Sequence, residues 1–241
     1  MNLVWLGQAG FYLVCDSGVR VMIDPYLSDA LFLKNGDRHR RLVPIDPEYL
    51  HAAADVLILT HAHEDHTDLM TLDQLFETNR DIAVLSPGNV QSILRSRYGT
   101  AEEWMLFEPG TEITLKQILF RATYAMHSDA CPIGVVIEEK GKYYCHTGDT
   151  MYHSRLQEEY PVNAELLALP INGKGNNMNA ADAARLTAKL MPKRVFPMHW
   201  DMFESYAGDV NEFVDCLGPT ETEILCSRQY EMTEIQGAAE Q

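Results

Sequence analysis

The sequence lacks a long hydrophobic run. No apolar stretch among its 241 residues approaches the roughly 20 residues that a membrane-spanning helix requires. The opening stretch MNLVWLGQAG has no basic segment followed by a long apolar one, which is typical of a first strand rather than of a signal peptide. We therefore expect a cytoplasmic protein without a membrane span.

Positive charge is also scarce. Lys and Arg number 19 against 35 Asp and Glu, which gives a formal net charge of −16 at pH 7. A surface of this charge repels phosphate backbones and anionic membranes. The composition therefore disfavours nucleic-acid binding, and we expect a small-molecule substrate as the partner. A homo-oligomer is compatible with this composition.

Closely spaced cysteine pairs are absent. The five cysteines are scattered without a C-x-x-C pair, which excludes a zinc ribbon and a disulfide framework. We expect them to act as small buried hydrophobic residues. They are Cys15, Cys131, Cys145, Cys216 and Cys226.

No low-complexity linker or internal repeat divides the chain. With 46% hydrophobic and 22% charged residues, it has the composition of a globular protein, and we expect one domain over residues 1–241. Short apolar runs predict strands at 3–7, 11–15, 19–24, 54–60, 82–86, 165–171, 194–200 and 223–226, with a hairpin over 134–147. Helical spacing and caps predict helices at 69–76, 89–97, 180–190 and 210–217. Strands interleaved with helices indicate the α/β class.

The stretch THAHEDHTD follows the apolar run at 54–60. His61, His63 and Asp65 are two residues apart, so an extended or looping segment can bring them together whereas a helix would scatter them. His66 follows at once. The helical zinc signature H-E-x-x-H is not formed, because Thr67 stands where its second histidine would be. Four ligand-type side chains at this spacing favour a metal site over the alternative, a solvated turn.

Further ligand-type residues end other predicted strands. His127 follows RATYAM, Asp149 lies in HTGDT, and His199 ends RVFPM. Active sites of α/β proteins collect at strand ends, and the two oxygens of Asp149 could bridge two ions. We expect two divalent metal ions; imidazole ligands suit Zn²⁺, and the carboxylates keep Mn²⁺ and iron compatible.

These motifs resemble those of the metallo-β-lactamase superfamily. The similarity covers nearly the whole chain, through WLGQAGF, VMIDPYLSD, THAHEDHTD, AMHSDA, HTGDT, PINGKGNNMN and PMHWDMF. The opening and closing stretches resemble the branch of L-ascorbate-6-phosphate lactonase-like metal-dependent hydrolases. The resemblance implies a four-layer αββα sandwich with a dinuclear site at one edge of its two sheets.

The resemblance also implies a role for each ligand. Flavin-linked di-iron members carry Glu where this chain has His63, and antibiotic-degrading members carry Cys where it has Asp149, so the resemblance favours hydrolysis of non-lactam esters. The implied ligands are His61, His63 and His127 for the first ion, Asp65, His66 and His199 for the second, and Asp149 between them.

Two metal ions would favour hydrolysis by a metal-bound hydroxide. Water held between them loses its proton near neutral pH, so a bridging hydroxide can attack a carbonyl or phosphoryl centre. We assign catalytic roles to Asp149, the bridge, and to Asp65, which is also a plausible proton acceptor. Asp24 either orients a ligand histidine by accepting its other N–H or caps the turn of VMIDPY; the sequence leaves both open.

The basic residues indicate the charge of the expected substrate. Arg38 to Arg41 form the one basic run of this acidic chain, and Lys174 and Asn172 lie in the loop INGKGNNMN. Guanidinium and ammonium groups near metal ions favour a phosphate or carboxylate on the substrate; solvated loops are the alternative. The substrate-binding candidates are Lys174, Asn172 and Arg40.

The sequence is compatible with three alternative functions. The leading one is a dinuclear metal-dependent hydrolase of a small, anionic (phosphorylated) lactone or ester. The second is a phosphodiesterase acting on a nucleotide, RNA or a phospholipid, which the net charge of −16 disfavours for polymers. The third is a non-catalytic metal-binding module, which the complete ligand set disfavours.

Overall fold

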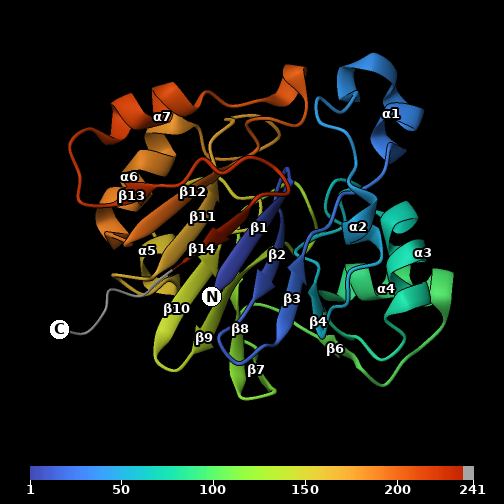
Figure 1. Cartoon of the computed structure of the whole chain (residues 1–241). Helices are drawn as coiled ribbons and strands as arrows, with labels where there is room; N and C mark the ends of the chain where they lie inside the picture. Colours follow the sequence, from blue (N-terminus) through green and yellow to red (C-terminus); the bar gives the residue numbers. More distant parts are fainter. Residues whose placement is uncertain (236–241) are drawn as a thin grey trace.

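Within the part of the chain that the structure describes, two β-sheets of seven strands each lie at the centre of the molecule, and helices cover their outer faces (Figure 1). The computed structural model describes residues 1–235. Of the domain expected over 1–241, residues 236–241 lie outside the described part, and the single-domain assignment stays a prediction.

The first sheet is formed mainly by the N-terminal half of the chain. Its strands are β1 (Asn2–Gly7), β2 (Gly10–Val14), β3 (Arg20–Ile23), β4 (Val56–Ile58), β5 (Ala83–Ser86), β6 (Trp104–Leu106) and β14 (Met232–Glu234). Their order is β14-β1-β2-β3-β4-β5-β6, antiparallel from β14 to β3 and parallel from β3 to β6. All residues of β4 are buried, because a parallel strand between two layers has no solvated face.

The second sheet repeats this plan with the C-terminal half. Its strands are β7 (Glu112–Leu115), β8 (Ile118–Tyr124), β9 (Ile133–Glu139), β10 (Lys142–His146), β11 (Leu166–Pro170), β12 (Arg194–Met198) and β13 (Glu223–Ile224). Neighbours from β7 to β10 are antiparallel and those from β10 to β13 are parallel. β9 and β10 form the predicted hairpin, which turns at Lys140 and Gly141; both have positive φ, which the tight hairpin turn requires.

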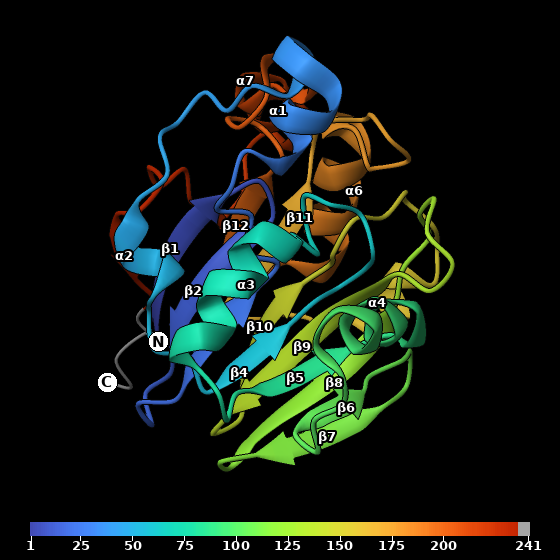
Figure 2. The same cartoon turned by 90° about the vertical axis from the view of Figure 1, so that its right-hand side faces the viewer.

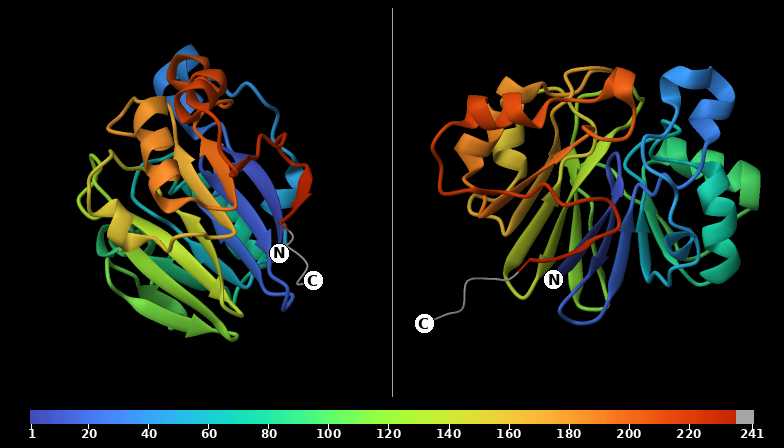
Figure 3. Two further views of the ribbon diagram at one scale, coloured as in Figure 1. Left: turned by 90° about the vertical axis from the view of Figure 1, so that its left-hand side faces the viewer. Right: turned by 45° about the horizontal axis from the view of Figure 1, so that its top comes forward.

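Helices lie outside the two sheets, most of them on an outer face. They are α1 (Ala30–Asn35), η1 (Gly36–His39), α2 (Pro47–Leu50), α3 (Leu69–Thr78), α4 (Gly88–Tyr98), α5 (Leu156–Glu159), α6 (Ala180–Leu190), η2 (Glu204–Tyr206) and α7 (Val210–Leu217). The set α2–α4 covers the first sheet (Figure 2), and α5–α7 covers the second (Figure 3). None of the helices within residues 1–235 combines the length and apolar composition needed to cross a bilayer.

Apolar side chains fill the space between the layers. One cluster lies between the sheets, and two others join each sheet to its helices. In the central cluster, the ring of Phe196 packs edge-on against those of Trp5 and Phe11, at centroid distances of 5.4 and 5.0 Å. Burial of such rings supplies a large share of the hydrophobic stabilisation. The predicted αββα sandwich is therefore confirmed.

Two helix starts were predicted from their caps, and both are confirmed. Asp68 accepts a hydrogen bond from the amide of Met70 at the start of α3. Asn179 accepts one from the amide of Asp182 at the start of α6, which spans the predicted 180–190. The caps mark these starts because each satisfies an otherwise unpaired backbone N–H.

The expectation for the cysteines is partly wrong. All five are free, and Cys15 and Cys145 are buried, but Cys131 is half-buried and Cys216 and Cys226 are exposed. Cys216 lies near the end of the amphipathic helix α7, whose one buried residue is Phe213. The residue type alone did not reveal which face of the helix Cys216 occupies.

A half-buried carboxylate gives the fold a testable pH dependence. Asp55, with its side chain 13% exposed, accepts hydrogen bonds from the Nε of Arg20 at 3.0 Å and the Nζ of Lys116 at 2.6 Å. Burial alone would raise the pKa of Asp55, but these donors outweigh it and lower the pKa below its ordinary value. Because the folded-state pKa is the lower one, the stabilisation is present above the unfolded-state pKa, about 3.9, and is lost as pH falls further.

The variant Asp55→Asn should therefore lower the free energy of unfolding by about 1–3 kcal/mol at pH 7, the range for charge-assisted hydrogen bonds. Urea unfolding at several pH values measures the difference, which should shrink below about pH 4. Asp73→Asn, which breaks the more exposed ion pair with Arg97, is the control and should lower the free energy of unfolding by less than Asp55→Asn does. A loss at Asp55 that stays constant down to pH 2 would contradict the assigned cause.

Candidate active site

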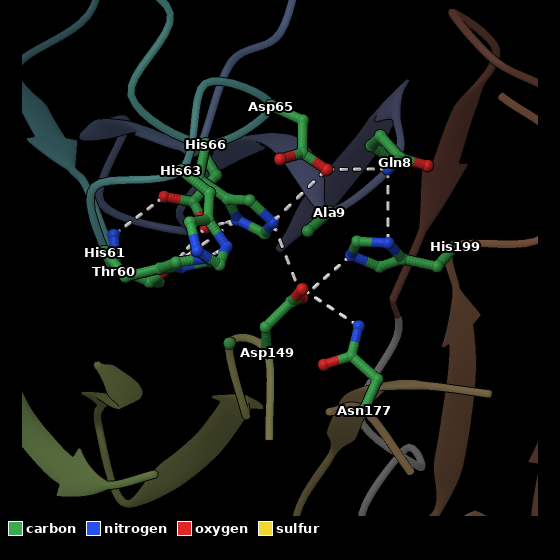
Figure 4. Close-up of polar contacts among 12 residues, drawn as sticks. Gln8, Ala9, Thr60, His61, His63, Asp65, His66, Asp149, Asn177 and His199 are labelled. Atoms are coloured by element: carbon green, nitrogen blue, oxygen red, sulfur yellow. Dashed lines mark hydrogen bonds and ion pairs between the residues drawn. The ribbon is translucent and has the colours of Figure 1, made fainter. Parts of the chain in front are cut away.

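The predicted ligands meet at one edge of the two stacked sheets. Figure 4 shows them, apart from His127, which is not labelled there, on loops from both sheets, with Asp149 facing the histidines of the loop after β4. The ligand loops follow β4, β8, β10 and β12. The sheets thus bring together residues that lie more than a hundred positions apart in the sequence.

Three histidines form the first group of candidate metal ligands, which we call the first ligand group. The Nδ1 of His63 lies 3.0 Å from the Nε2 of His61 and 3.1 Å from the Nε2 of His127. Nitrogen ligands about 2.0–2.1 Å from a tetrahedral zinc ion are about 3.3–3.4 Å apart. The group therefore needs only a small expansion to hold an ion. The Nδ1 of His127 faces the carbonyl oxygen of Asn176 at 3.2 Å, which fixes the ring.

The second ligand group is centred on Asp149. Its Oδ1 lies 2.8 Å from the Nε2 of His199 and 3.5 Å from the Nε2 of His66, and its Oδ2 lies 3.7 Å from the Nε2 of His127. The Oδ2 of Asp65 is 3.8 Å from the Nε2 of His66. The atoms that lie mutually within 4.8 Å are those of His61, His66 and Asp149, so His61 is shared between the two groups.

Several atoms of this group are buried without a hydrogen bond. Within residues 1–235, no hydrogen-bond partner is present for the Nε2 of His66, the Oδ1 of Asp149 or the Nε2 of His199, although the three atoms face one another. Buried polar atoms are almost always satisfied. Imidazole nitrogens around a carboxylate are also the donor set that zinc and manganese accept. The residues therefore fit a divalent ion at this point.

The charges of the site favour a cation. Burial alone would lower the pKa of His66, but Asp149, Asp24 and Asp65 outweigh burial and raise it well above the ordinary value. Burial lowers the pKa of His61, and the neighbouring His66 lowers it further. A neutral imidazole such as that of His61 can ligate a metal ion, and the three carboxylates attract positive charge to the same place.

Asp24 lies behind the ligands, in a fully buried position. Its Oδ1 accepts a hydrogen bond from the backbone N–H of Thr60 at 2.8 Å, and its Oδ2 accepts one from the Thr60 hydroxyl at 2.5 Å. The same Oδ2 is 2.7 Å from the Nδ1 of His66. The carboxylate thus contacts a ligand histidine through the ring nitrogen that points away from the ligand group, which is the orienting role considered from the sequence.

Three contacts at the site were not predicted from the sequence. Thr60 holds Asp24 as described, and Asn177 donates a hydrogen bond to the Oδ2 of Asp149 at 2.9 Å. Gln8 contacts both Asp65 and His199. Asn177 is in the loop INGKGNNMN and Gln8 is in WLGQAGF, so both motifs were noticed; amide side chains are not typical ligands and carried no signal of their own.

A cavity of about 440 Å³ opens beside the ligands. Lys174 and Asn172 line it, as expected of substrate-binding residues, and so do His39 and Tyr206, whose rings stack at 5.0 Å. Arg40 lies elsewhere: it pairs with Asp37 and lines a separate cavity of about 300 Å³. The structure brings two of the three substrate-binding candidates to the ligand group.

Comparison with known proteins places this chain in a family. A model of the beta-lactamase superfamily domain matches residues 19–200. The UPF0173 protein PF0020 of Pyrococcus furiosus is 30% identical over 88% of this chain and 89% of its own. The UPF0173 metal-dependent hydrolase Ta0764 of Thermoplasma acidophilum is 27% identical over 93% and 94% of the two chains.

A solved structure agrees with these relatives. Igni18, described as a novel metallo hydrolase from the archaeon Ignicoccus hospitalis, has a TM-score of 0.73 and 25% identity, covering 96% of this chain and 97% of its own. The superfamily resemblance is confirmed, while the narrower similarity to L-ascorbate-6-phosphate lactonases stays a prediction. With a family model matching most of its length and a relative at 30% identity, the chain belongs to the beta-lactamase superfamily.

Proposed function

We propose that this chain, a metal-dependent hydrolase, holds two divalent ions and hydrolyses a small lactone or ester that carries an anionic group such as a phosphate. The observation that carries the proposal is the orientation of Asp149. Its Oδ1 faces His66 and His199, while its Oδ2 faces His127 of the first group. A carboxylate with one oxygen toward each group is placed to bridge two ions.

The first ion would be held by the three histidines of the first group and the second by the side chains around Asp149. Zn²⁺ or Mn²⁺ suits the mixture of imidazole and carboxylate, and iron is compatible. The proposed ligands are His61, His63 and His127 for the first ion, Asp65, His66 and His199 for the second, and Asp149 for both. When bound, the ions would lower the pKa of a water molecule toward neutrality and polarise the scissile bond.

The chain's own residues supply the remaining steps. Asp65 lines the cavity with a side chain that is 20% exposed, so it can reach a substrate-side water and accept a proton. Gln8 donates a hydrogen bond to the Oδ2 of Asp65 at 2.8 Å, which orients that carboxylate toward the reacting groups. Asn177 holds the Oδ2 of Asp149.

The anionic part of the substrate would lie near Lys174. The Nζ of Lys174 donates to the carbonyl oxygens of Ser205 and Ala207 at 3.1 and 3.4 Å. An ammonium has three N–H donors, so one stays available for a phosphate or carboxylate. Lys34 also lines the cavity, where it pairs with Glu64. Arg40 lies outside this cavity, and the proposal gives it no role.

The test is metal content together with a substrate panel. Chain freed of metal and reloaded with Zn²⁺ or Mn²⁺ should contain about two ions per chain by elemental analysis, because two ligand groups are present. The reloaded chain should hydrolyse phosphorylated lactones or esters faster than the same compounds without phosphate. One ion or fewer at saturation would contradict the dinuclear site. Hydrolysis of phosphodiesters alone, or of no compound, would contradict the proposed substrate class.

A further inference from the structure

Gln8 lies just after β1, between Asp65 and His199, two of the proposed ligands of the second ion. It is in the turn between β1 and β2 and is only 3% exposed. Its φ is +53°, a backbone conformation that residues other than glycine rarely adopt. The indole N–H of Trp5 donates to its carbonyl oxygen at 3.2 Å, and the amide of His199 approaches the same oxygen at 3.4 Å. These contacts hold the unusual backbone and aim the side chain at the site.

The Gln8 side chain joins two proposed ligands that come from different sheets. Its Nε2 donates to the Oδ2 of Asp65 at 2.8 Å and lies 3.2 Å from the Nδ1 of His199 (Figure 4). Asp65 follows β4 of the first sheet, and His199 follows β12 of the second. One amide thus sets the position of a carboxylate and an imidazole that would hold the same ion.

The two contacts make different demands on that amide. The carboxylate of Asp65 can only accept hydrogen bonds, so it requires an N–H from Gln8. His199 faces Asp149 through Nε2; if that nitrogen gives its lone pair to an ion, its proton must lie on Nδ1, and His199 then requires an acceptor. Both side chains face the same atom of the amide, Nε2, whose two N–H groups can reach Asp65 and an unprotonated Nδ1 of His199; the adjoining Oε1 is the acceptor that Gln8 can offer once that Nδ1 carries the proton.

We infer that Gln8 is a positioning residue for the second ion, and this inference rests on the proposed dinuclear function. Glutamine donates to Asp65 and carries on the same rigid group the oxygen that His199 would need when it ligates an ion. Glutamate at the same position could accept from His199 but would repel Asp65, and methionine would fill the space without serving either ligand. The loss of such supporting hydrogen bonds typically weakens metal binding about 10–100-fold.

The experiment compares metal binding in four chains. Wild type, Gln8→Met, Gln8→Glu and the control Gln91→Met are freed of metal and titrated with Co²⁺ against a competing chelator, and the visible cobalt spectrum is recorded at each step. Gln91 is a matched control because it is also buried and donates through its Nε2, to the Ser86 hydroxyl at 3.0 Å and the Met105 carbonyl at 3.1 Å. It does not line the cavity beside the ligands.

Gln8→Met and Gln8→Glu should bind the first ion as wild type does and the second about 10–100-fold more weakly, with changed absorption bands for the second ion only. Gln91→Met should bind both ions like wild type even if its melting temperature falls. If wild type binds two ions and both Gln8 variants bind the second equally well, this inference is wrong and the proposed function stands. A wild type that binds a single ion contradicts the proposed function and this inference together.

Discussion

Asp149→Ala is expected to lose at least one ion and nearly all turnover. The substitution removes both oxygens that face the two ligand groups, so no side chain would hold the ions at the roughly 3.5–4 Å separation that a shared water requires. His66 and His199 would also lose the carboxylate that their Nε2 atoms face. We expect at least one binding constant to fall by about 100-fold or more, beyond the typical effect of a supporting residue.

Elemental analysis and calorimetric metal titration measure this loss, with hydrolysis assayed on the same samples. Asp201→Ala is a suitable control, since Asp201 follows the same strand as His199 but does not line the cavity. It should bind metal like wild type. Two tightly bound ions and wild-type turnover in Asp149→Ala would remove Asp149 from its proposed place between the ions.

Asp24→Asn is expected to weaken binding of the second ion although Asp24 is not itself a proposed ligand. Asp24 is fully buried, and its Oδ2 serves both the Thr60 hydroxyl and the Nδ1 of His66. An asparagine has one acceptor oxygen, so either Thr60 or His66 must lose an acceptor or face an N–H. We expect roughly 10–100-fold weaker binding of the second ion and a loss of about 3 kcal/mol in unfolding free energy, as for a broken buried pair.

The control variant Glu139→Gln distinguishes a loss of metal affinity from a loss of stability. Glu139 is buried away from the ligands and accepts from the backbone amides of Asp16 and Ser17, so this control should lower stability without changing metal affinity. Urea unfolding and Co²⁺ titration of both variants make the comparison. If Asp24→Asn loses stability but keeps wild-type affinity for both ions, Asp24 supports the fold alone, as the turn-capping alternative from the sequence would have it.

Sequence patterns indicated the ligand loops because ligand-type residues ended buried strands. His61 and His63 follow the apolar run of β4, and His199 follows that of β12. Such a pattern is informative because polar groups at the end of a buried strand need a reason to be there. Gln8 has no such signal: glutamine is not a typical metal ligand, and the importance of Gln8 depends on which side chains the second sheet places beside it.

The fold was predictable where local signals were strong. The strands with continuous apolar runs and the helices with caps at Asp68 and Asn179 were found from their own residues. The helix α1 was not, because none of its residues is buried and so no amphipathic pattern marks it. Lys174 illustrates a third case: its loop was recognised, but its contacts to Ser205 and Ala207 depend on a segment far along the chain.

The last described strand pairs with the first, and this has a consequence for the chain during its synthesis. Leu3 and Val4 of β1 are buried and lie opposite Thr233 and Met232 of β14. Until the ribosome has released those C-terminal residues, β1 presents an apolar strand with one open edge, which is the kind of surface that pairs with other chains. A nascent or C-terminally truncated chain therefore leaves this N-terminal strand open to aggregation, and β14 is the segment that closes that edge.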